Sequence, residues 1–193
     1  MKLDSKKRKY IIVGVALLSV LIIAIVSIYR VTCSPRVKNE KAIKAVITSL
    51  LTCPDVELNQ LMKLCTTKLG PEPGDIEKPK PEDLERFDNK MKDMFGKYVT
   101  NNTLEYIQTS RALGYHVFTE EKRYEMLVED LEINQDKNDS RNYTFTVHIK
   151  YGSPDNEKKQ LVVTGRAQCV EVGKITFLKF SDDFFNNEFM NSN

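Results

Sequence analysis

The stretch that decides the fold is NYTFTVHIKY, residues Asn142–Tyr151. Apolar and polar side chains alternate through it without a break, and successive side chains of a β-strand point to opposite faces of its sheet. One face of this predicted strand is apolar and therefore faces a core. The other face carries Thr144, Thr146, His148 and Lys150, and we expect these four side chains to contact either solvent or a protein partner.

Strand signals continue on both sides of this stretch. The segment Tyr124–Ile133 has strand composition, but its alternation breaks near Glu129 and Asp130, which predicts a β-bulge. After a turn at residues 152–156, Gln160–Val172 is a predicted long strand. A tight turn at Gly173-Lys174 then leads into Ile175–Phe180. These segments predict an antiparallel meander.

Helical periodicity dominates the chain before Gly114. We expect helices from Ser34 or Asn39 to Leu51, from Pro54 in a first turn to Gly70, from Pro81 to Gly96, and a short one that begins at Thr100 or Asn101. A loop rich in proline and glycine, Gly70–Pro81, separates the second helix from the third. Helices that come first and strands that follow predict an α+β domain, with the helices packed on one face of a curved antiparallel sheet.

A second decisive feature is the apolar segment Tyr10–Tyr29, which contains no charge, amide or proline. Twenty helical residues rise about 30 Å, the thickness of the hydrocarbon layer of a membrane. Tyr10 and Tyr29 lie at the ends, where aromatic rings favour the membrane interface. The segment therefore predicts an N-terminal transmembrane helix. A basic cluster precedes it: Lys6, Lys7, Arg8 and Lys9.

Three other interpretations of this segment remain open. They are a cleaved signal peptide, a lipoprotein modified at Cys33, and a buried core helix. The apolar core is longer than that of a signal peptide, the residues before Cys33 do not suit lipidation, and no face of the helix is polar. The positive-inside bias places the basic tail in the cytoplasm and the rest of the chain outside a cell membrane. The predicted boundaries are 1–9 for the tail, 10–29 for the anchor, 30–38 for a linker, 39–181 for an extracytoplasmic domain and 182–193 for a C-terminal tail.

The charge balance excludes a nucleic-acid partner. The chain has 29 basic and 27 acidic residues, and its first 29 residues hold five basic residues and one acidic residue. The remaining 164 residues therefore hold 24 basic and 26 acidic residues. A domain with balanced charge lacks the electropositive surface that phosphate binding requires.

The four cysteines are Cys33, Cys53, Cys65 and Cys169. Their spacing matches no metal-binding pattern, and the chain has only two histidines, so we expect no metal and no cofactor. Cys53 and Cys65 are too far apart along a predicted helix to form a disulfide with each other. A bridge from Cys53 or Cys65 to Cys169 stays open, as does the simpler interpretation of reduced thiols.

This order of elements resembles the nuclear transport factor 2-like (cystatin-like) fold. It is similar to that of membrane-anchored extracytoplasmic proteins of Gram-positive bacteria, and the resemblance covers roughly Asn39–Ser181. It implies a cone with an open mouth and an exposed sheet face suited to dimerisation. It also implies one concrete role, because the bitopic assembly proteins of conjugation and type IV secretion machines combine a short cytoplasmic tail, one anchor and an outer domain of this kind.

Few residues offer chemistry. His116 lies in a predicted aromatic loop near Glu120 and Glu121, where a histidine beside a carboxylate can act as a general acid or base, although a lone histidine in such a loop more often packs or contacts solvent. Two further groups are aromatic. The first group either belongs to the core or lines an apolar pocket: Tyr143, Phe145, Tyr151, Phe177 and Phe180. The second group lies in the C-terminal tail and either packs on the domain or docks on a partner: Phe184, Phe185 and Phe189.

Two classes of function fit this sequence. The first, which we favour, is a membrane-tethered interaction or scaffold domain without catalytic activity. It would bind membrane lipid through its anchor and a protein partner, or a second copy, through its outer domain. The second is a cone-shaped cavity outside the cell that binds or converts a small molecule. A filled cone with a polar sheet face favours the first class, whereas an open apolar pocket with a perturbed titratable group favours the second.

Overall fold

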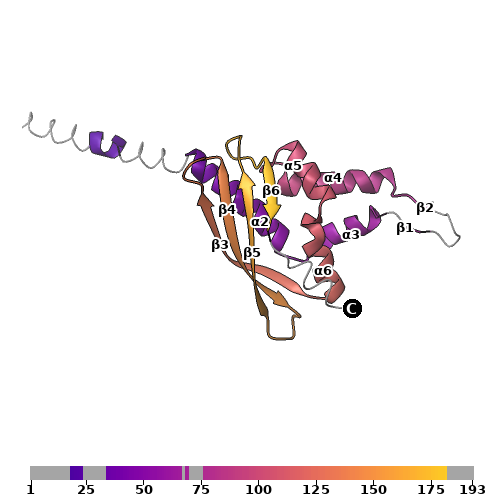
Figure 1. The fold of residues 1–193 in the computed structure, drawn as a ribbon. Coiled ribbons are helices and arrows are strands. Elements are labelled where there is room, and N and C mark those ends of the chain that lie inside the picture. Colours follow the sequence, from indigo (N-terminus) through magenta and orange to yellow (C-terminus); the bar gives the residue numbers. More distant parts are fainter. Residues whose placement is uncertain (1–17, 24–33, 67, 70–75, 182–193) are drawn as a thin grey trace, which may run out of the picture.

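The computed structural model describes residues 18–23, 34–66, 68–69 and 76–181, and in them helices pack against a four-stranded antiparallel sheet (Figure 1). The helices come first, as expected for an α+β chain. They are α2 (Pro35–Leu51), α3 (Val56–Leu64), α4 (Pro81–Phe95), α5 (Asn101–Thr109), the 3₁₀ turn η1 (Arg111–Leu113) and α6 (Gly114–Lys122). The strands of the large sheet are β3 (Glu125–Gln135), β4 (Asn142–Gly152), β5 (Lys159–Gln168) and β6 (Phe177–Phe180). Along the chain, α3 and α4 are connected by a small hairpin of β1 (Lys68–Leu69) and β2 (Ile76–Glu77).

The sheet is a simple meander of order β3-β4-β5-β6. The predicted β-bulge is confirmed, because the register of β3 against β4 shifts between Val128 and Asp130. A bulge bends its strand and increases the local twist, and β3 bends across the lower part of the sheet in Figure 1. The alternation of β4 is also confirmed: Tyr143, Phe145, Val147, Ile149 and Tyr151 are all buried.

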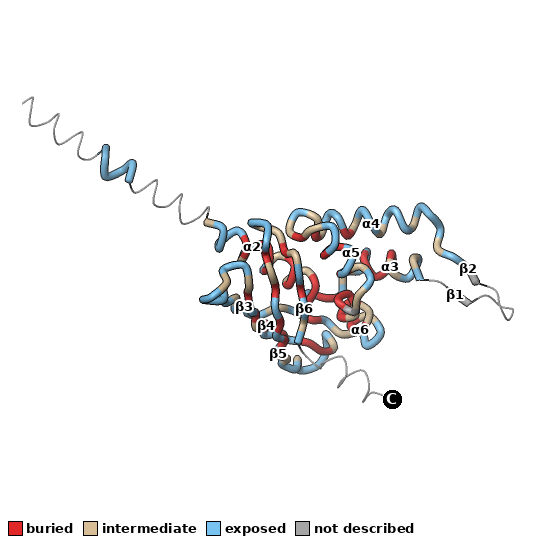
Figure 2. The backbone as a smooth tube through the Cα atoms, turned by 45° about the horizontal axis from the view of Figure 1, so that its top comes forward, coloured by how far each residue is buried: buried red, intermediate tan, exposed pale blue. Residues whose placement is uncertain are grey.

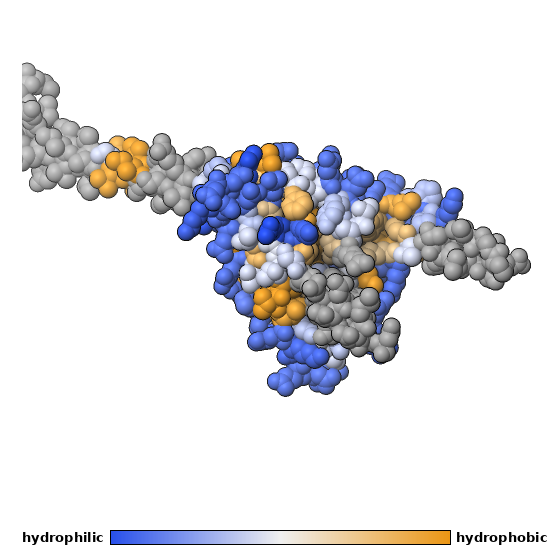
Figure 3. Space-filling view, viewed as in Figure 1, coloured by the Kyte–Doolittle hydropathy of each residue, from blue (hydrophilic) through white to orange (hydrophobic). Residues whose placement is uncertain are grey.

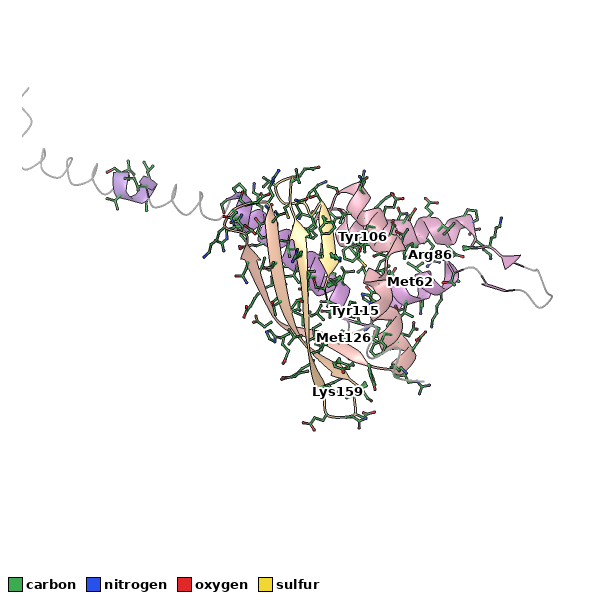
Figure 4. The ribbon with its side chains drawn as sticks, viewed as in Figure 1. Met62, Arg86, Tyr106, Tyr115, Met126 and Lys159 are labelled. Atoms are coloured by element: carbon green, nitrogen blue, oxygen red, sulfur yellow. The ribbon has the colours of Figure 1, made fainter. Side chains whose placement is uncertain are left out.

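The helices cover the inner face of the sheet, and the core lies between the two layers (Figure 2). Helix α2 packs along β3, with its seam of Ile43, Val46, Ile47 and Leu50 fully buried. Aromatic rings fill the space between sheet and helices, where Phe145 and Tyr115 each meet the ring of Phe180 edge-on. Figure 4 shows Tyr115 and Met126 within this layer.

Gly165 of β5 is required by this packing. A Cβ atom built on Gly165 would lie 2.5 Å from the carbonyl oxygen of Lys179 and would also overlap the ring of Phe145. The absence of a side chain therefore lets the Phe145 ring lie directly on the backbone of β5.

Four of the predicted helix boundaries agree with the structure. Ser34 is the N-cap of α2, and its Oγ accepts a hydrogen bond from the Val37 N–H at 3.3 Å. Pro81 occupies the first turn of α4, which ends at Gly96. Thr100 is the N-cap residue of α5.

Four expectations about the elements were wrong. Pro54 precedes α3, because Asp55 takes the N-cap position, and α3 ends at Leu64 rather than at Gly70. Strand β5 ends at Gln168 rather than at Val172, because the following residues turn, with the Lys174 N–H donating to the Glu171 oxygen. His116 lies in helix α6, not in a loop. A further correction concerns one side chain: of the two alternatives for Phe177, core and apolar pocket, the core is wrong, because Phe177 is about half exposed.

Candidate functional site

The outer face of the four-stranded sheet is an exposed surface built by regular structure. The four predicted face residues lie on it: Thr144, His148 and Lys150 are exposed, and Thr146 is partly exposed. Helix α2 lies behind the sheet in the view of Figure 1, so this face points toward the reader. The structure thus brings the four residues together on one surface that the described helices do not cover.

The neighbouring strands extend this surface into rows. Thr144 lies between Asn134 of β3 and Arg166 of β5, and Arg166 in turn pairs with Lys179 of β6. The next row along the strands is Glu132, Thr146 and Thr164, followed by Asp130, His148 and Val162. The sequence alone did not show which alternate residues of β5 face outward. The register of β4 against β5 places Thr164, Arg166 and Gln168 on the same face as His148.

A groove of about 650 Å³ opens at one end of this face. Its lining residues come from all four strands and from the turn after β3: Asn134, Gln135, Asp136, Asn142, Tyr143, Thr144, Arg166, Ala167, Gln168 and Phe177. The lining is rich in amide and hydroxyl groups, which form hydrogen bonds in either direction. Such a surface suits a polar backbone or polar side chains of a macromolecule.

The charges on the outer face are segregated. Acidic residues line the β3 side, with Glu129, Asp130 and Glu132 on that strand. Basic residues line the other side, with Arg166 on β5 and Lys179 on β6. Lys150 on β4 forms an ion pair with Glu129 at 2.5 Å. The outer face therefore has an acidic side and a basic side, and the order of residues in the sequence did not reveal this separation of charge.

Three large apolar side chains interrupt the polar face. Leu127, Val162 and Phe177 are 52%, 50% and 49% exposed, and their registers place them on the outer side of β3, β5 and β6. Separate orange patches of apolar residues lie among blue and white ones on the side of the domain seen in Figure 3. Sequence reasoning missed all three, because an apolar residue in a strand is usually assigned to the core. The three do not form one patch, because Phe177 pairs with Gln168, six residues along β5 from Val162, so they are separate apolar points on a polar surface.

A smaller apolar groove of about 180 Å³ lies between α5 and β6. Its lining combines Tyr106, which is labelled in Figure 4, with Phe177 and Leu178. Phe177 also lines the larger groove, so the two hollows share one wall. The β6 side of the sheet therefore joins a polar groove to an apolar one through a single exposed aromatic ring.

His116 is fully buried and serves the fold. Its Nδ1 accepts a hydrogen bond from the Asp55 N–H, and its Nε2 donates to the carbonyl oxygen of Ser49, both at 3.2 Å. Burial lowers the pKa of His116. Both ring nitrogens are therefore occupied by backbone groups, and the neutral ring joins the end of α2 to the start of α3. The expected neighbour Glu120 instead pairs with Lys63 at 2.6 Å.

An ionic cluster supports the same junction from outside. Asp55 caps α3 by accepting from the Leu58 N–H at 2.9 Å, and Lys90 of α4 contacts Asp55 at 3.2 Å and Glu57 at 2.7 Å. Partial burial raises the pKa of Asp55, but the Leu58 N–H and Lys90 outweigh it, so that the pKa lies below its ordinary value. A polar groove between α3 and α4 begins at this cluster and extends to Arg86 (Figure 4).

The thiols of the described residues form neither a disulfide nor a metal site. Cys53, Cys65 and Cys169 are free. Burial raises the pKa of Cys53, and it raises the pKa of Cys169 to about 12, so both are protonated and unreactive at neutral pH. Across residues 18–23, 34–66, 68–69 and 76–181, no group of three or more histidine, cysteine or acidic side chains is arranged to hold a metal ion.

The predicted anchor residues Tyr10, Tyr29, Lys6, Lys7, Arg8 and Lys9 lie outside the described residues, as do Cys33 and the phenylalanines of the C-terminal tail. Residues 18–23 carry the central part of the predicted anchor, and the described part of it is helical. In the part of the chain that the structure describes, none of the helices has both the length and the apolar composition of a membrane span.

Comparison with protein-family models, with curated proteins and with solved structures found no match for this chain.

Proposed function

We propose that this protein is a membrane-tethered interaction domain without catalytic activity, held outside a cell membrane by the segment Tyr10–Tyr29. The uncharged length of that segment and the basic cluster before it support the tether and its orientation. Residues 18–23 add support, because Leu18, Val20, Leu21, Ile22 and Ile23 are each more than half exposed. A helix that presents apolar side chains on all sides suits a lipid environment.

One observation carries the interaction role: the outer sheet face combines segregated charge with three half-exposed apolar side chains. Apolar side chains that a partner can cover add affinity to a contact whose polar groups set its orientation. The inner face supports the same conclusion, because it is filled by buried rings such as Tyr115, Tyr143 and Phe145. His116 has no free nitrogen for proton transfer, which weighs against a catalytic cavity. The layered architecture is consistent with a nuclear transport factor 2-like fold.

The occupant that best fits this face is a second copy of the chain. Two sheets pack face to face with their strands nearly aligned, and a dimer commonly has a two-fold axis. If that axis runs along the strands between β4 and β5, β3 of one copy lies over β6 of the other. Glu132 then faces the partner copy's basic edge at Lys179, and the same contact occurs twice. A polarised face is thus complementary to itself in this one arrangement.

A dimer of this kind at a membrane surface is suited to assembly work. Two anchors and two short cytoplasmic tails would be held together by the outer domains, while the helical layers α3 to α5 stay free for further contacts. We propose on this basis that the chain is a scaffold or assembly component of a cell-envelope complex. A conjugation or secretion machine is the concrete form that the resemblance implies.

Photocrosslinking in intact membranes tests this proposal. A benzophenone amino acid at Thr146, in the middle of the outer face, is expected to yield a crosslinked dimer. The same group at Glu85, which is exposed on α4, serves as the control and is expected to yield little. The charge argument is tested by Glu132→Lys and Lys179→Glu, each of which should reduce the Thr146 adduct, and by the double variant, which should restore it.

The possible outcomes separate the parts of this proposal. An adduct of Thr146 with a different protein would keep the interaction role but overturn the second copy as the occupant. An equal yield at both positions, or no protein adduct from Thr146, would overturn the role of the outer face. Failure of the double variant to recover would contradict the pairing of β3 with β6.

A further inference from the structure

One end of the domain carries exposed valines beside the start of α2. The loop between β5 and β6 and the turn between β3 and β4 lie at this end, next to the point where α2 begins (Figure 1). Val37 in α2 is 37% exposed, and Val170 and Val172 in the β5–β6 loop are 56% and 54% exposed. An orange patch lies over the β5–β6 loop in Figure 3. We call Val170 and Val172, the two valines of this loop, the valine cluster.

A buried asparagine fixes the loop to the helix. Asn39 of α2 accepts a hydrogen bond from the Gly173 N–H at 2.7 Å and donates one to the Tyr143 hydroxyl at 3.1 Å. Gly173 adopts the left-handed region with a φ of 79°, which lets the loop turn tightly against Lys38. The valines of the loop are therefore held in place beside α2 by a clamp that is itself part of the core.

The tether brings this end close to the membrane. Only four residues, 30–33, separate the end of the apolar segment at Tyr29 from the N-cap Ser34. Five peptide steps span at most about 17 Å even when fully extended. Gly173 contacts α2 at Asn39, and five helical residues beyond Ser34 add about 8 Å. The valine cluster is therefore held within roughly 25 Å of the anchor's end.

We propose that the valine cluster rests in the headgroup layer of the membrane and fixes the orientation of the domain. This inference depends on the proposed tether. Side chains of valine bury apolar surface at such an interface, and the tether supplies a high effective concentration, so that a weak contact is sufficient. Lys38 and Lys174 lie beside the cluster and can reach anionic headgroups. Glu171 lies there too, so apolar contact makes the larger contribution.

This contact would have a consequence for the outer sheet face. The strands run away from the end that carries the valine cluster, as the position of the β4–β5 turn at the far end shows (Figure 1). With the cluster on the membrane, the outer face stands roughly upright and is presented sideways to neighbours in the same membrane. The lipid contact would thus reduce the freedom that two copies lose when they associate.

The absence of tryptophan from this chain makes the proposal directly measurable. The full-length Val172→Trp variant would be reconstituted into vesicles of phosphatidylcholine and phosphatidylglycerol that contain a fraction of brominated lipid, which quenches nearby indole. The control is Asn156→Trp, which places the indole at an exposed position in the β4–β5 turn at the opposite end. We expect brominated lipid to remove much of the indole emission of Val172→Trp and to leave that of Asn156→Trp almost unchanged.

A second pair of variants separates lipid contact from mere closeness. The emission of Val170→Trp should be quenched as strongly as that of Val172→Trp, and adding Val172→Asp to Val170→Trp should reduce that quenching. Near-ultraviolet circular dichroism of each variant checks the fold. If the chain floats with the vesicles but Val172→Trp is quenched no more than Asn156→Trp, the valine cluster does not touch lipid and the inference is wrong. If the chain does not float with the vesicles, the proposed tether fails and the inference fails with it.

Discussion

At the scale of single residues, His116 is the clearest example of a polar side chain whose hydrogen bonds stabilise the fold. Its Nδ1 can accept from the Asp55 N–H only when that nitrogen carries no proton, so the ring must be neutral with its hydrogen on Nε2. Protonation would lose this hydrogen bond and would place a charge in a fully buried site. The junction of α2, α3 and α6 therefore depends on the charge state of one side chain.

This dependence predicts a loss of stability in mild acid. Because the pKa of His116 is lowered in the folded state, the unfolded chain binds the proton more readily, and stability falls as pH drops below about 6.5. We expect the thermal midpoint of the full chain in detergent to be lower at about pH 5.5 than at about pH 7.5. His116→Gln should lower the midpoint but flatten this pH dependence. The other histidine provides the matched control, since His148→Gln should retain the dependence. A slope that survives in His116→Gln would contradict this account.

The residues of the outer face show what alternation can and cannot reveal. Thr144, Thr146, His148 and Lys150 were placed on one face by the period of β4, and the structure agrees. Phe177 was expected either in the core or in an apolar pocket, but its pairing with Gln168 puts it on the outer side, where it lines a small apolar groove. Short strands such as β6 contain too few alternations to fix parity, so the aromatic part of the candidate site could not be found from sequence.

At the scale of elements, α3 is a nine-residue helix that relies on its cap. Replacing Asp55 with Ala removes the acceptor of the Leu58 N–H and one partner of Lys90, which is expected to cost about 1 kcal/mol, within a range of roughly 0.5–2 kcal/mol. Amide hydrogen exchange in residues 56–64 should accelerate accordingly. Asp55→Asn retains a capping oxygen and should accelerate exchange less. Equal exchange in the two variants would show that the cap does not stabilise α3.

The longer elements followed from local patterns, and the errors arose where tertiary contacts decide. Apolar spacing located α2 and α4, and the break in alternation located the bulge of β3. The expected extension of β5 to Val172 failed, because Gly173 and Asn39 impose a turn that depends on a residue more than a hundred positions away. The hydrogen bonds of His116 likewise involve Ser49 and Asp55, which are more than sixty positions away and could not be paired with it from local sequence.

At the scale of the whole molecule, the anchor and the outer domain should behave as separate units. A charge at Phe145, which is 1% exposed, cannot be accommodated in the core, whereas Phe177 is exposed on the same sheet. Phe145→Asp is therefore expected to unfold the outer domain, and Phe177→Asp to leave it folded. Limited proteolysis of the reconstituted chain distinguishes the two. Both variants should stay in the membrane fraction, and a protease-resistant Phe145→Asp would contradict the assignment of the core.

The most direct test of the central claim is alkaline carbonate extraction of cell membranes combined with protease added to intact cells. The account predicts that the uncut chain stays in the carbonate pellet, and that external protease removes the outer domain and leaves only a short protected fragment. Release of the full-length chain into the carbonate supernatant, or complete protection of the domain in intact cells, would contradict it.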